Sequence, residues 1–491
     1  MTLPRLSNAT LADLPAAVER PAYDRAAIET GIVHLGVGAF HRAHQAVYTD
    51  AVLKDDPRWG ILGVSLRNPD TRDALEPQDG LYTVAAVDGA GARLKIVGSS
   101  TGLVVAPEDP ARLVEILARP TTRIVTLTVT EKGYCHDPAT GRLNESDPGI
   151  RRDLEHIDRP KTAIGFLAAG LKRRFEAGVA PFTVLSCDNL PANGETVKRI
   201  LSRFAELVDP AFGRFVASEV AFPSSMVDRI VPATTEADHA TIAAALGVAD
   251  HWPVMTEPFS QWVIEDHFTL GRPDWASAGA EFVSDVKPYE LMKLRLLNGS
   301  HSTIAYLGYL MGRGTVSEAM AVPALKQLVA GLMDEEITPT LPTLSGFDVG
   351  RYKRSLVERF ENPALKHRTW QIAMDGSQKL PQRLLGTIRD RIAAGASFER
   401  LALGVAAWMR YVTGLDEDGA PIDVRDPLAA RLKAIGEAGR GDARHMVAGY
   451  LEVREVFGAD LAGHADFRAT LERHLTKLLA QGARATVEGL A

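Results

Sequence analysis

The sequence is poor in cysteine, and this shortage excludes two classes of protein. Cys135 and Cys187 are the only cysteines among 491 residues, so no disulfide framework can support the fold. Neither stands in a Cys/His cluster with the spacing of zinc ligands, and we expect no metal site. We expect both thiols to be buried or incidental, so that catalysis relies on other side chains and an organic cofactor.

Long apolar runs and excess positive charge are also missing. No stretch approaches the roughly 20 apolar residues of a membrane helix, and residues 1–5 lack the apolar core of a signal peptide, which predicts a cytoplasmic protein without a membrane partner. The net charge of -7 argues against a nucleic-acid partner. We expect short basic runs, such as residues 172–174, to be solvated helix faces. A small molecule is the expected partner, and the chain should be a monomer or a small homo-oligomer.

The length and the hydrophobic pattern predict an α/β fold in two domains. Hydrophobic residues make up 46% of the chain, enough for two or three cores. Strand-like runs alternate in part with helical segments, which predicts a Rossmann-type, doubly wound sheet over residues 1–285. A mostly α-helical domain should follow over residues 286–491. The strand-like runs are 32–38, 61–66, 124–129 and 182–186; the helical segments are 109–118, 162–177 and 194–207, followed by 289–311, 322–336, 398–413 and 467–481.

A glycine turn after the first predicted strand indicates dinucleotide binding. Gly36 and Gly38 match the first two glycines of G-x-G-x-x-G, while His41 takes the third position. The first glycine permits the tight turn, and the second lets the main chain approach a pyrophosphate at the helix N-terminus. An ordinary glycine-rich turn is the alternative, but the flanking strand and helix favour a cofactor site. We predict that residues 1–285 bind NAD(P) through Gly36, Gly38, Ala39 and Phe40.

The second predicted strand ends without an acid at its tip, where residues 65–70 read Ser-Leu-Arg-Asn-Pro-Asp. An acid there would favour NAD by accepting from the ribose 2′-hydroxyl. Arg67 could instead pair with the 2′-phosphate of NADP or stack on the adenine, unless it is a solvated loop residue. We expect NAD as cofactor, with NADP left open.

Residues 290–301 combine a lysine, an amide and an imidazole in an apolar helical frame. At about 100° per residue, Lys293, Glu290, His301 and Asn298 fall at about 0°, 60°, 80° and 140°, on one face. A lysine beside an apolar surface has a lowered pKa, so its neutral amine can act as a general base. Asn298 can donate to a developing alkoxide, and His301 can orient the same oxygen. The alternative is a polar stripe that faces solvent.

A second polar cluster follows the strand predicted to end at Ser186. It consists of residues 186–189, Ser-Cys-Asp-Asn, and open α/β sheets bind ligands at this end of their strands. Asn189 could supply a second donor to the alkoxide. This cluster weakens the solvent-stripe alternative for residues 290–301.

Five stretches resemble the long-chain mannitol dehydrogenase family, in matching order and over nearly the whole chain. The resemblance implies an N-terminal Rossmann-type domain, a C-terminal helical domain and a metal-independent active site between them. It also implies hydride transfer between NAD(P) and C2 of an acyclic sugar or sugar acid. The stretches are residues 32–44, 128–134, 186–189, 226–230 and 293–301.

The resemblance also assigns roles to residues. Lys293 is similar to the family's general base and His301 to its substrate-orienting histidine. Asn189 and Asn298 resemble its oxyanion-stabilising pair. Further matches are Glu290, which resembles a glutamate that gates proton exit from the lysine; Asp228, near the nicotinamide; and Thr130 and Glu131, in a cofactor-binding segment.

Residues 367–383 resemble the fructuronate reductase (D-mannonate oxidoreductase) branch more than the mannitol branch. Gln371 stands where the mannitol enzymes carry an arginine. A substrate carboxylate needs a cationic partner, and Arg368, Lys379 and Arg383 are candidates, although basic helix residues are more often solvated. We therefore expect D-fructuronate to be reduced to D-mannonate.

Three alternatives to this reaction remain. One is a polyol 2-dehydrogenase of the mannitol or arabinitol type, and another is an epimerase with tightly held nicotinamide. The third, from a different class, is a nucleotide sensor without turnover. The combination of Lys293, Asn298 and His301 argues against a sensor.

Overall fold

The chain divides into two compact units, Met1–Lys287 and Pro288–Ala491, which we call unit 1 and unit 2. The computed structural model describes residues 3–137, 140–344, 346–439 and 441–490. In this part of the chain no helix is both long and apolar enough to cross a membrane.

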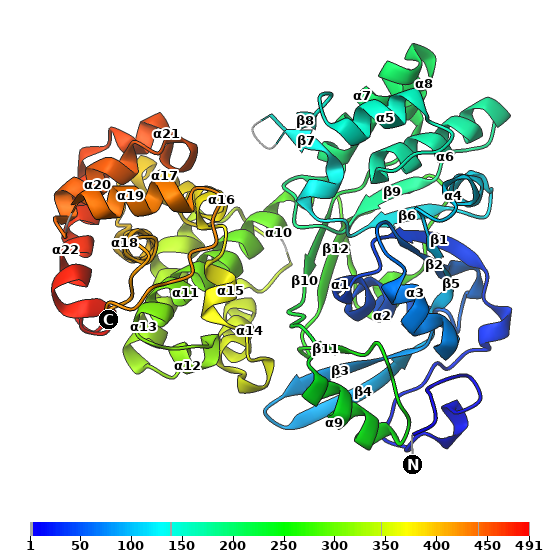
Figure 1. The fold of residues 1–491 in the computed structure, drawn as a ribbon, viewed down its shortest axis with the longest axis horizontal. Helices are drawn as coiled ribbons and strands as arrows, with labels where there is room; N and C mark the ends of the chain where they lie inside the picture. The colour runs from blue at the N-terminus through cyan, green and yellow to red at the C-terminus, as the bar shows by residue number, and fades with distance from the viewer. Residues whose placement is uncertain (1–2, 138–139, 345, 440, 491) are drawn as a thin grey trace. The chain divides into compact units, whose positions relative to one another are not determined.

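A parallel sheet of five described strands forms the centre of unit 1, which confirms the predicted Rossmann-type class (Figure 1). The strand order β5-β2-β1-β6-β9 reverses direction at β1, and dinucleotides bind at such a switch point. Four of these strands match the predicted runs; β5 was not predicted. The strands are β1 (Thr30–Leu35), β2 (Gly60–Ser65), β5 (Ser100–Val105), β6 (Ile124–Leu127) and β9 (Thr183–Ser186).

Both faces of this sheet are buried, because successive side chains of each strand point to opposite faces. Val33 and Leu35 of β1 pack with α4 and α6, whereas Ile32 packs on the opposite face with α2. The helices of unit 1 are α1 (Ala39–Ala43), α2 (Gln45–Val52), α3 (Asp70–Leu75), α4 (Pro110–Ala118), α5 (Pro148–Glu155), α6 (Ala163–Ala177), α7 (Asn193–Val208), α8 (Pro210–Glu219) and α9 (Glu236–Leu246).

The described residues of unit 1 also form three smaller sheets that the sequence pattern did not predict. One joins β10 (Ser225–Asp228), β12 (Gln261–Glu265) and β13 (Glu281–Val283). A second joins β11 (Val254–Thr256), β3 (Tyr82–Asp88) and β4 (Gly91–Val97). The last pairs β7 (His136–Asp137) with β8 (Arg142–Leu143) in antiparallel orientation. The first of these sheets places Asp228, a predicted site residue, at the end of a strand.

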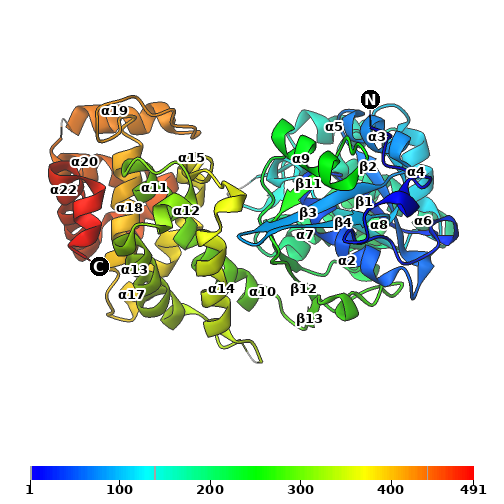
Figure 2. The same cartoon turned by 90° about the horizontal axis from the view of Figure 1, so that it is seen from below.

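The described part of unit 2 is mostly helical, as expected. α11 and α18 are buried on nearly every side and pack against each other, and α22 packs on α18 (Figures 1 and 2). The helices are α10 (Lys287–Met292), α11 (Ser300–Leu310), α12 (Val316–Met320), α13 (Pro323–Gly331), α14 (Val349–Glu361), α15 (Thr369–Ala373), α16 (Gly376–Leu380), α17 (Gly386–Ala393), α18 (Glu399–Tyr411), α19 (Ala429–Gly439), α20 (Ala443–Leu451), α21 (Arg454–Ala462) and α22 (Ala465–Glu488).

The expectation of a solvated face at residues 172–174 is wrong for Arg174. Lys172 pairs with Glu176 at the surface, but Arg174 is fully buried. Its guanidinium donates to the carbonyl oxygens of Leu117 (3.0 Å) and Ala180 (2.8 Å). Arg174 therefore ties the end of α4 to the chain that leads into β9.

Candidate active site

The turn after β1 has the shape that a dinucleotide needs. Gly36 has φ +98°, and a Cβ there would lie 2.3 Å from the carbonyl oxygen of Thr128, so the position requires glycine. Gly38 is different, because the nearest described atom to a Cβ there is the carbonyl oxygen of Gly36, at 3.9 Å. The space over Gly38 is open, and a pyrophosphate could approach the main chain there.

His41, at the third glycine position, stacks on His34 of β1 with ring centroids 3.4 Å apart. His34 Nε2 donates to the carbonyl oxygen of Gly36 (3.0 Å), and Thr128 Oγ1 donates to the same oxygen (2.7 Å). Burial lowers the pKa of His34 to about 3, so its ring is neutral. A third glycine would let the helix pack closely on the strand; here stacked imidazoles fill that contact and hold the turn.

The remaining cofactor candidates of the sheet edge are exposed or half-buried. Ala39 is exposed, the Phe40 ring stacks on His44 at 5.1 Å, and Arg67 is exposed just beyond β2. A hollow of about 740 Å³ opens at the adjoining Leu66. Its apolar wall includes Ala106 and Pro107, and its basic lining residues are Arg152, Arg159 and Lys161.

Thr130 and Glu131 follow β6 and are exposed. Thr130 has φ +64° and ψ 164°, a conformation found almost only in glycine, which costs a threonine on the order of 1–3 kcal/mol. Asp188 accepts hydrogen bonds from the N–H groups of Val129 (2.8 Å) and Thr130 (3.1 Å), and from Tyr134 Oη (2.7 Å). Asp188 stands within the polar cluster of residues 186–189, but the sequence pattern indicates no role for it.

Asn193 joins the segment after β9 to the start of β10. Its side chain donates to the carbonyl oxygen of Ser225 (2.8 Å) and accepts from the N–H of Ser225 (2.9 Å). It also donates to the carbonyl oxygen of Asp188 (3.2 Å). Asn189, which is exposed, therefore follows a braced strand end, while Asp228, which is buried, lies at the other end of β10.

Lys293 and His301 are 8% and 6% exposed, which excludes a solvent-facing stripe for these two residues. Glu290 and Asn298 are half-buried. The assumption of a uniform α-helix is wrong, because Lys293–Gly299 is π-helical, and hydrogen bonds from i to i+5 change the angular step. π-helical turns occur frequently at functional sites.

The π-helical segment Pro381–Leu385 packs closely on the first one. A Cβ at Gly299 would lie 2.8 Å from the carbonyl oxygen of Arg383, so glycine permits this approach. Arg383 Nη1 donates to Ser302 Oγ (3.2 Å) and lies 3.5 Å from the carbonyl oxygen of Asn298. Arg383 therefore stands beside the segment that carries Asn298 and His301.

Aromatic rings and positive charges surround His301. Its ring packs on Phe360 at 4.6 Å and on His367 at 5.2 Å, and its Nε2 has no hydrogen-bond partner among the described residues. Burial lowers the pKa of His301 well below its usual value, and His367, Arg359, Arg383 and Lys293 lower it further. Burial and the charge of Lys379 lower the pKa of His367 to about 4. We call Lys293, Arg359, His367, Lys379 and Arg383, together with His301, the His301 cluster.

The predicted carboxylate-binding residues differ in their surroundings. Lys379 Nζ donates to the carbonyl oxygen of Met374 (2.6 Å) and belongs to the His301 cluster. Arg368 and Gln371 are exposed. Arg359, only 7% exposed, was missed, because a single arginine in a strongly charged amphipathic helix gives no signal of burial.

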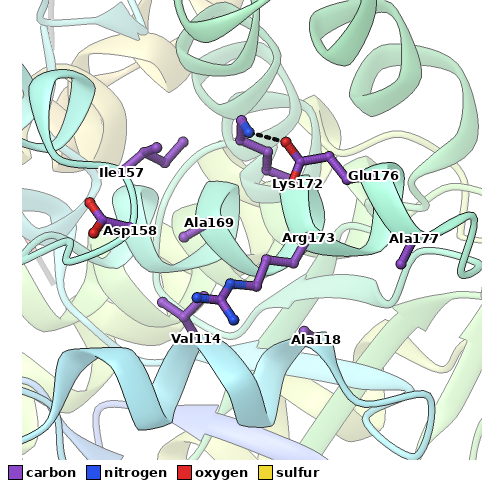
Figure 3. Close-up of a pocket in the computed structure, with 9 residues that line it drawn as sticks. All are labelled: Val114, Ala118, Ile157, Asp158, Ala169, Lys172, Arg173, Glu176 and Ala177. Carbon is purple, nitrogen blue, oxygen red and sulfur yellow. Dashed lines mark hydrogen bonds and ion pairs between the residues drawn. The ribbon is translucent and has the colours of Figure 1, made fainter.

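Two further observations concern cofactors and cavities. Within the described residues no group of three or more His, Cys, Asp or Glu side chains is placed to hold a metal ion. The hollow in Figure 3, about 690 Å³, lies on α4 and α6 and is lined by apolar side chains, by Asp158 and Arg173, and by the Lys172–Glu176 ion pair. None of the predicted site residues lines it.

Two family models match the chain: the mannitol dehydrogenase Rossmann domain over residues 30–277 and the mannitol dehydrogenase C-terminal domain over residues 285–479. D-mannonate oxidoreductase of Escherichia coli (strain K12) is 46% identical and covers 98% of this chain and 100% of its own length. Mannitol 2-dehydrogenase of Aspergillus fumigatus is 39% identical, with 98% of each chain covered.

The solved structures include the ternary complex of Pseudomonas fluorescens mannitol 2-dehydrogenase with NAD and D-mannitol. It matches with a TM-score of 0.89 and 40% identity over 99% of both chains. The predicted resemblance is thereby confirmed, and the chain belongs to the mannitol dehydrogenase family.

Proposed function

We propose that this chain is an NAD-dependent oxidoreductase that reduces the C2 ketone of D-fructuronate to D-mannonate, reversibly and without a metal. The positive charge around His301 is the observation that carries this proposal. The charges of Arg359, Arg383 and Lys293 lower the pKa of His301, and the charge of Lys379 lowers the pKa of the adjoining His367. A hexuronate carries a carboxylate that such charges would bind, whereas a polyol is neutral. The 46% identity to a D-mannonate oxidoreductase supports the same substrate.

The turn at Gly36 and Gly38 fits the cofactor, because the space over Gly38 is open to a pyrophosphate. NAD is favoured because a relative was solved with NAD, while the exposed Arg67 keeps NADP as a second possibility. We assign Ala39, Phe40, Thr130, Glu131 and Asp228 to the same site. When bound, NADH supplies the hydride that forms the new C–H bond at C2.

The side chains then manage the charge and the proton. As the carbonyl electron pair moves onto the C2 oxygen, Asn189 and Asn298 donate hydrogen bonds to it. Lys293, in its ammonium form, gives this oxygen its proton. Glu290 passes a proton from solvent back to the lysine. In the oxidation direction, neutral Lys293 accepts the hydroxyl proton.

His301 orients the substrate as a neutral group. Its pKa lies well below the usual value because the ring is buried, so it remains uncharged near pH 7. Its Nε2 has no hydrogen-bond partner among the described residues, and in this proposal it binds a substrate oxygen. An additional positive charge at His301 would be opposed by the arginines and the lysine around it.

A polyol 2-dehydrogenase is the second candidate. Mannitol 2-dehydrogenases match nearly the whole chain at 39% to 41% identity, so the shared catalytic residues do not separate the two activities. The difference in substrate between the two activities must come from residues that contact the substrate away from C2.

The test compares one charged and one neutral substrate in the same variants. Lys379→Met and Arg383→Met should raise KM for D-fructuronate by about 10- to 150-fold, because a charge-assisted hydrogen bond is worth about 1.5–3 kcal/mol. KM for D-fructose should change much less. Arg368→Met tests the third predicted partner, and as an exposed residue it should have the smallest effect. Equal effects on both substrates would support the polyol candidate.

A further inference from the structure

Thr130 is held in a backbone conformation that a β-branched residue avoids. Six described residues other than glycine have positive φ, and five of them lie in the ordinary left-handed helical region with ψ between 28° and 54°. Thr130 has ψ 164° and is the β-branched member of the set. Because its side chain is exposed, burial does not hold it there. Its neighbours must do so.

The main chain at Thr130 is held by a carboxylate. Asp188 Oδ1 accepts from the N–H of Thr130, and Oδ2 accepts from the N–H of Val129 and from Tyr134 Oη. Tyr134 Oη also lies 2.6 Å from Oγ of Ser186, the last residue of β9. The tyrosine hydroxyl is therefore held by both Ser186 and Asp188. Two carboxylate oxygens thus meet three donors.

The residues held in this way lie between two parts of the candidate site. On one side, Thr128 Oγ1 donates to the carbonyl oxygen of Gly36 in the dinucleotide turn. On the other side, Asn189 directly follows Asp188, whose own carbonyl oxygen accepts from Asn193. A shift of the Asp188 carboxylate would move both the cofactor loop and Asn189.

We propose that Asp188 is a positioning residue, whose carboxylate holds Thr130 in its strained conformation and thereby places Asn189 and the cofactor loop 128–131. The proposal rests on the proposed function in that it uses the roles given to Asn189 and Thr130. Strained backbone concentrates at functional sites, where the surrounding structure over-determines it. Asp188 makes its contacts with main chain and Tyr134 and acts on the reaction through the residues that it places.

The first experiment is Asp188→Asn, which keeps the shape but turns one acceptor oxygen into an amide that faces main-chain N–H donors. We expect kcat to fall by about tenfold to 100-fold, since misplacement by about 1 Å can cost 100-fold. Asp250→Asn is the matched control, because the buried Asp250 also accepts from two main-chain N–H groups, those of Thr83 (2.6 Å) and Trp252 (2.9 Å). The control should lose stability with kcat unchanged.

The second experiment is a double-mutant cycle with Thr130→Gly. Glycine adopts the observed conformation without strain, so Asp188 is no longer needed to hold it. The fall in kcat caused by Asp188→Asn should therefore shrink at least fivefold when residue 130 is glycine. Equal falls in the two backgrounds, or an Asp188→Asn enzyme that loses stability but keeps full kcat, would overturn the proposal.

If Asp188→Asn does not fold, Tyr134→Phe replaces it in the same cycle, because it removes one donor from the carboxylate. Its smaller fall in kcat should also shrink with glycine at residue 130, and an unchanged fall would overturn the proposal. The cycle uses whichever ketose or keturonate the wild-type enzyme reduces with NADH. Its result therefore tests the role of Asp188 whichever substrate is the correct one. Full kcat in Asn189→Ala would instead contradict the proposed function.

Discussion

Gly36 and Gly38 stand in the same turn but have different tasks. Gly36 needs positive φ and has no space for a Cβ, whereas Gly38 has an ordinary φ of -86° and open space above it. Gly36→Ala should therefore lower the thermal unfolding midpoint. Gly38→Val should keep the midpoint and raise the Kd of NADH by at least about tenfold, or 1.4 kcal/mol. Calorimetry and NADH titration measure both, and unchanged NADH affinity in folded Gly38→Val would mean that the cofactor binds elsewhere.

Lys293 should give the two reaction directions opposite pH dependences. It must be neutral to accept a proton and charged to donate one, and its burial should place its pKa below the ordinary value of about 10.4. Oxidation kcat/KM should rise with pH through that pKa, and reduction should fall through it. Lys293→Ala should remove this ionisation from both profiles and lower kcat by several orders of magnitude, with NADH affinity nearly unchanged. Retained pH profiles in Lys293→Ala would make the lysine a structural residue.

At the scale of elements, the strands and helices with strong periodicity could be predicted, while their irregularities could not. The helix expected directly after the glycine turn is present, but at His44 (φ -126°, ψ -91°) the structure divides it into α1 and α2. The π-helical turn at Lys293–Gly299 was missed, because the pattern of apolar residues reports burial and not hydrogen-bond register. In the three small sheets, β10, β11 and β13 have three or four residues and β7 and β8 have two, too few to show a period; the longer strands β3, β4 and β12 were not predicted either.

Glu336 caps α18, a central helix of unit 2. Its two carboxylate oxygens each accept from a main-chain N–H at the start of that helix, Arg400 and Leu401, both at 2.9 Å. Glu336→Ala should lower the free energy of unfolding by about 2–4 kcal/mol, because two donors lose their partners. The neighbouring Glu335, 63% exposed in its ion pair with Arg400, is the matched control, and Glu335→Ala should cost less than about 1 kcal/mol. Urea denaturation compares them, and similar losses would contradict the capping role.

At the scale of the whole molecule, the family and the fold class could be predicted from motifs spread along the chain, and both are confirmed. The residues that support the candidate site could not be predicted in this way. Asp188, Arg359 and His34 act through contacts between segments far apart in sequence, and such contacts leave no local pattern. His41 takes the position of the third glycine, and only the structure shows that it stacks on His34.

The proposed mechanism without a metal can be tested on the whole enzyme by chelation. The proposed mechanism stabilises the alkoxide with Asn189 and Asn298 and needs no Lewis acid. Exhaustive treatment with EDTA, followed by dialysis, should leave kcat/KM unchanged in both directions. Activity that is lost and then restored by zinc would contradict this mechanism.

The central claim is that the chain reduces a sugar acid rather than a neutral ketose. The most direct measurement is kcat/KM of the wild-type enzyme for D-fructuronate and for D-fructose, each with NADH and with NADPH at pH 7. The charges of the His301 cluster predict that D-fructuronate is preferred by about 10- to 150-fold, the equivalent of about 1.5–3 kcal/mol for a charge-assisted contact to the carboxylate. Reduction of D-fructose with an equal or higher kcat/KM would contradict the account and identify a polyol 2-dehydrogenase.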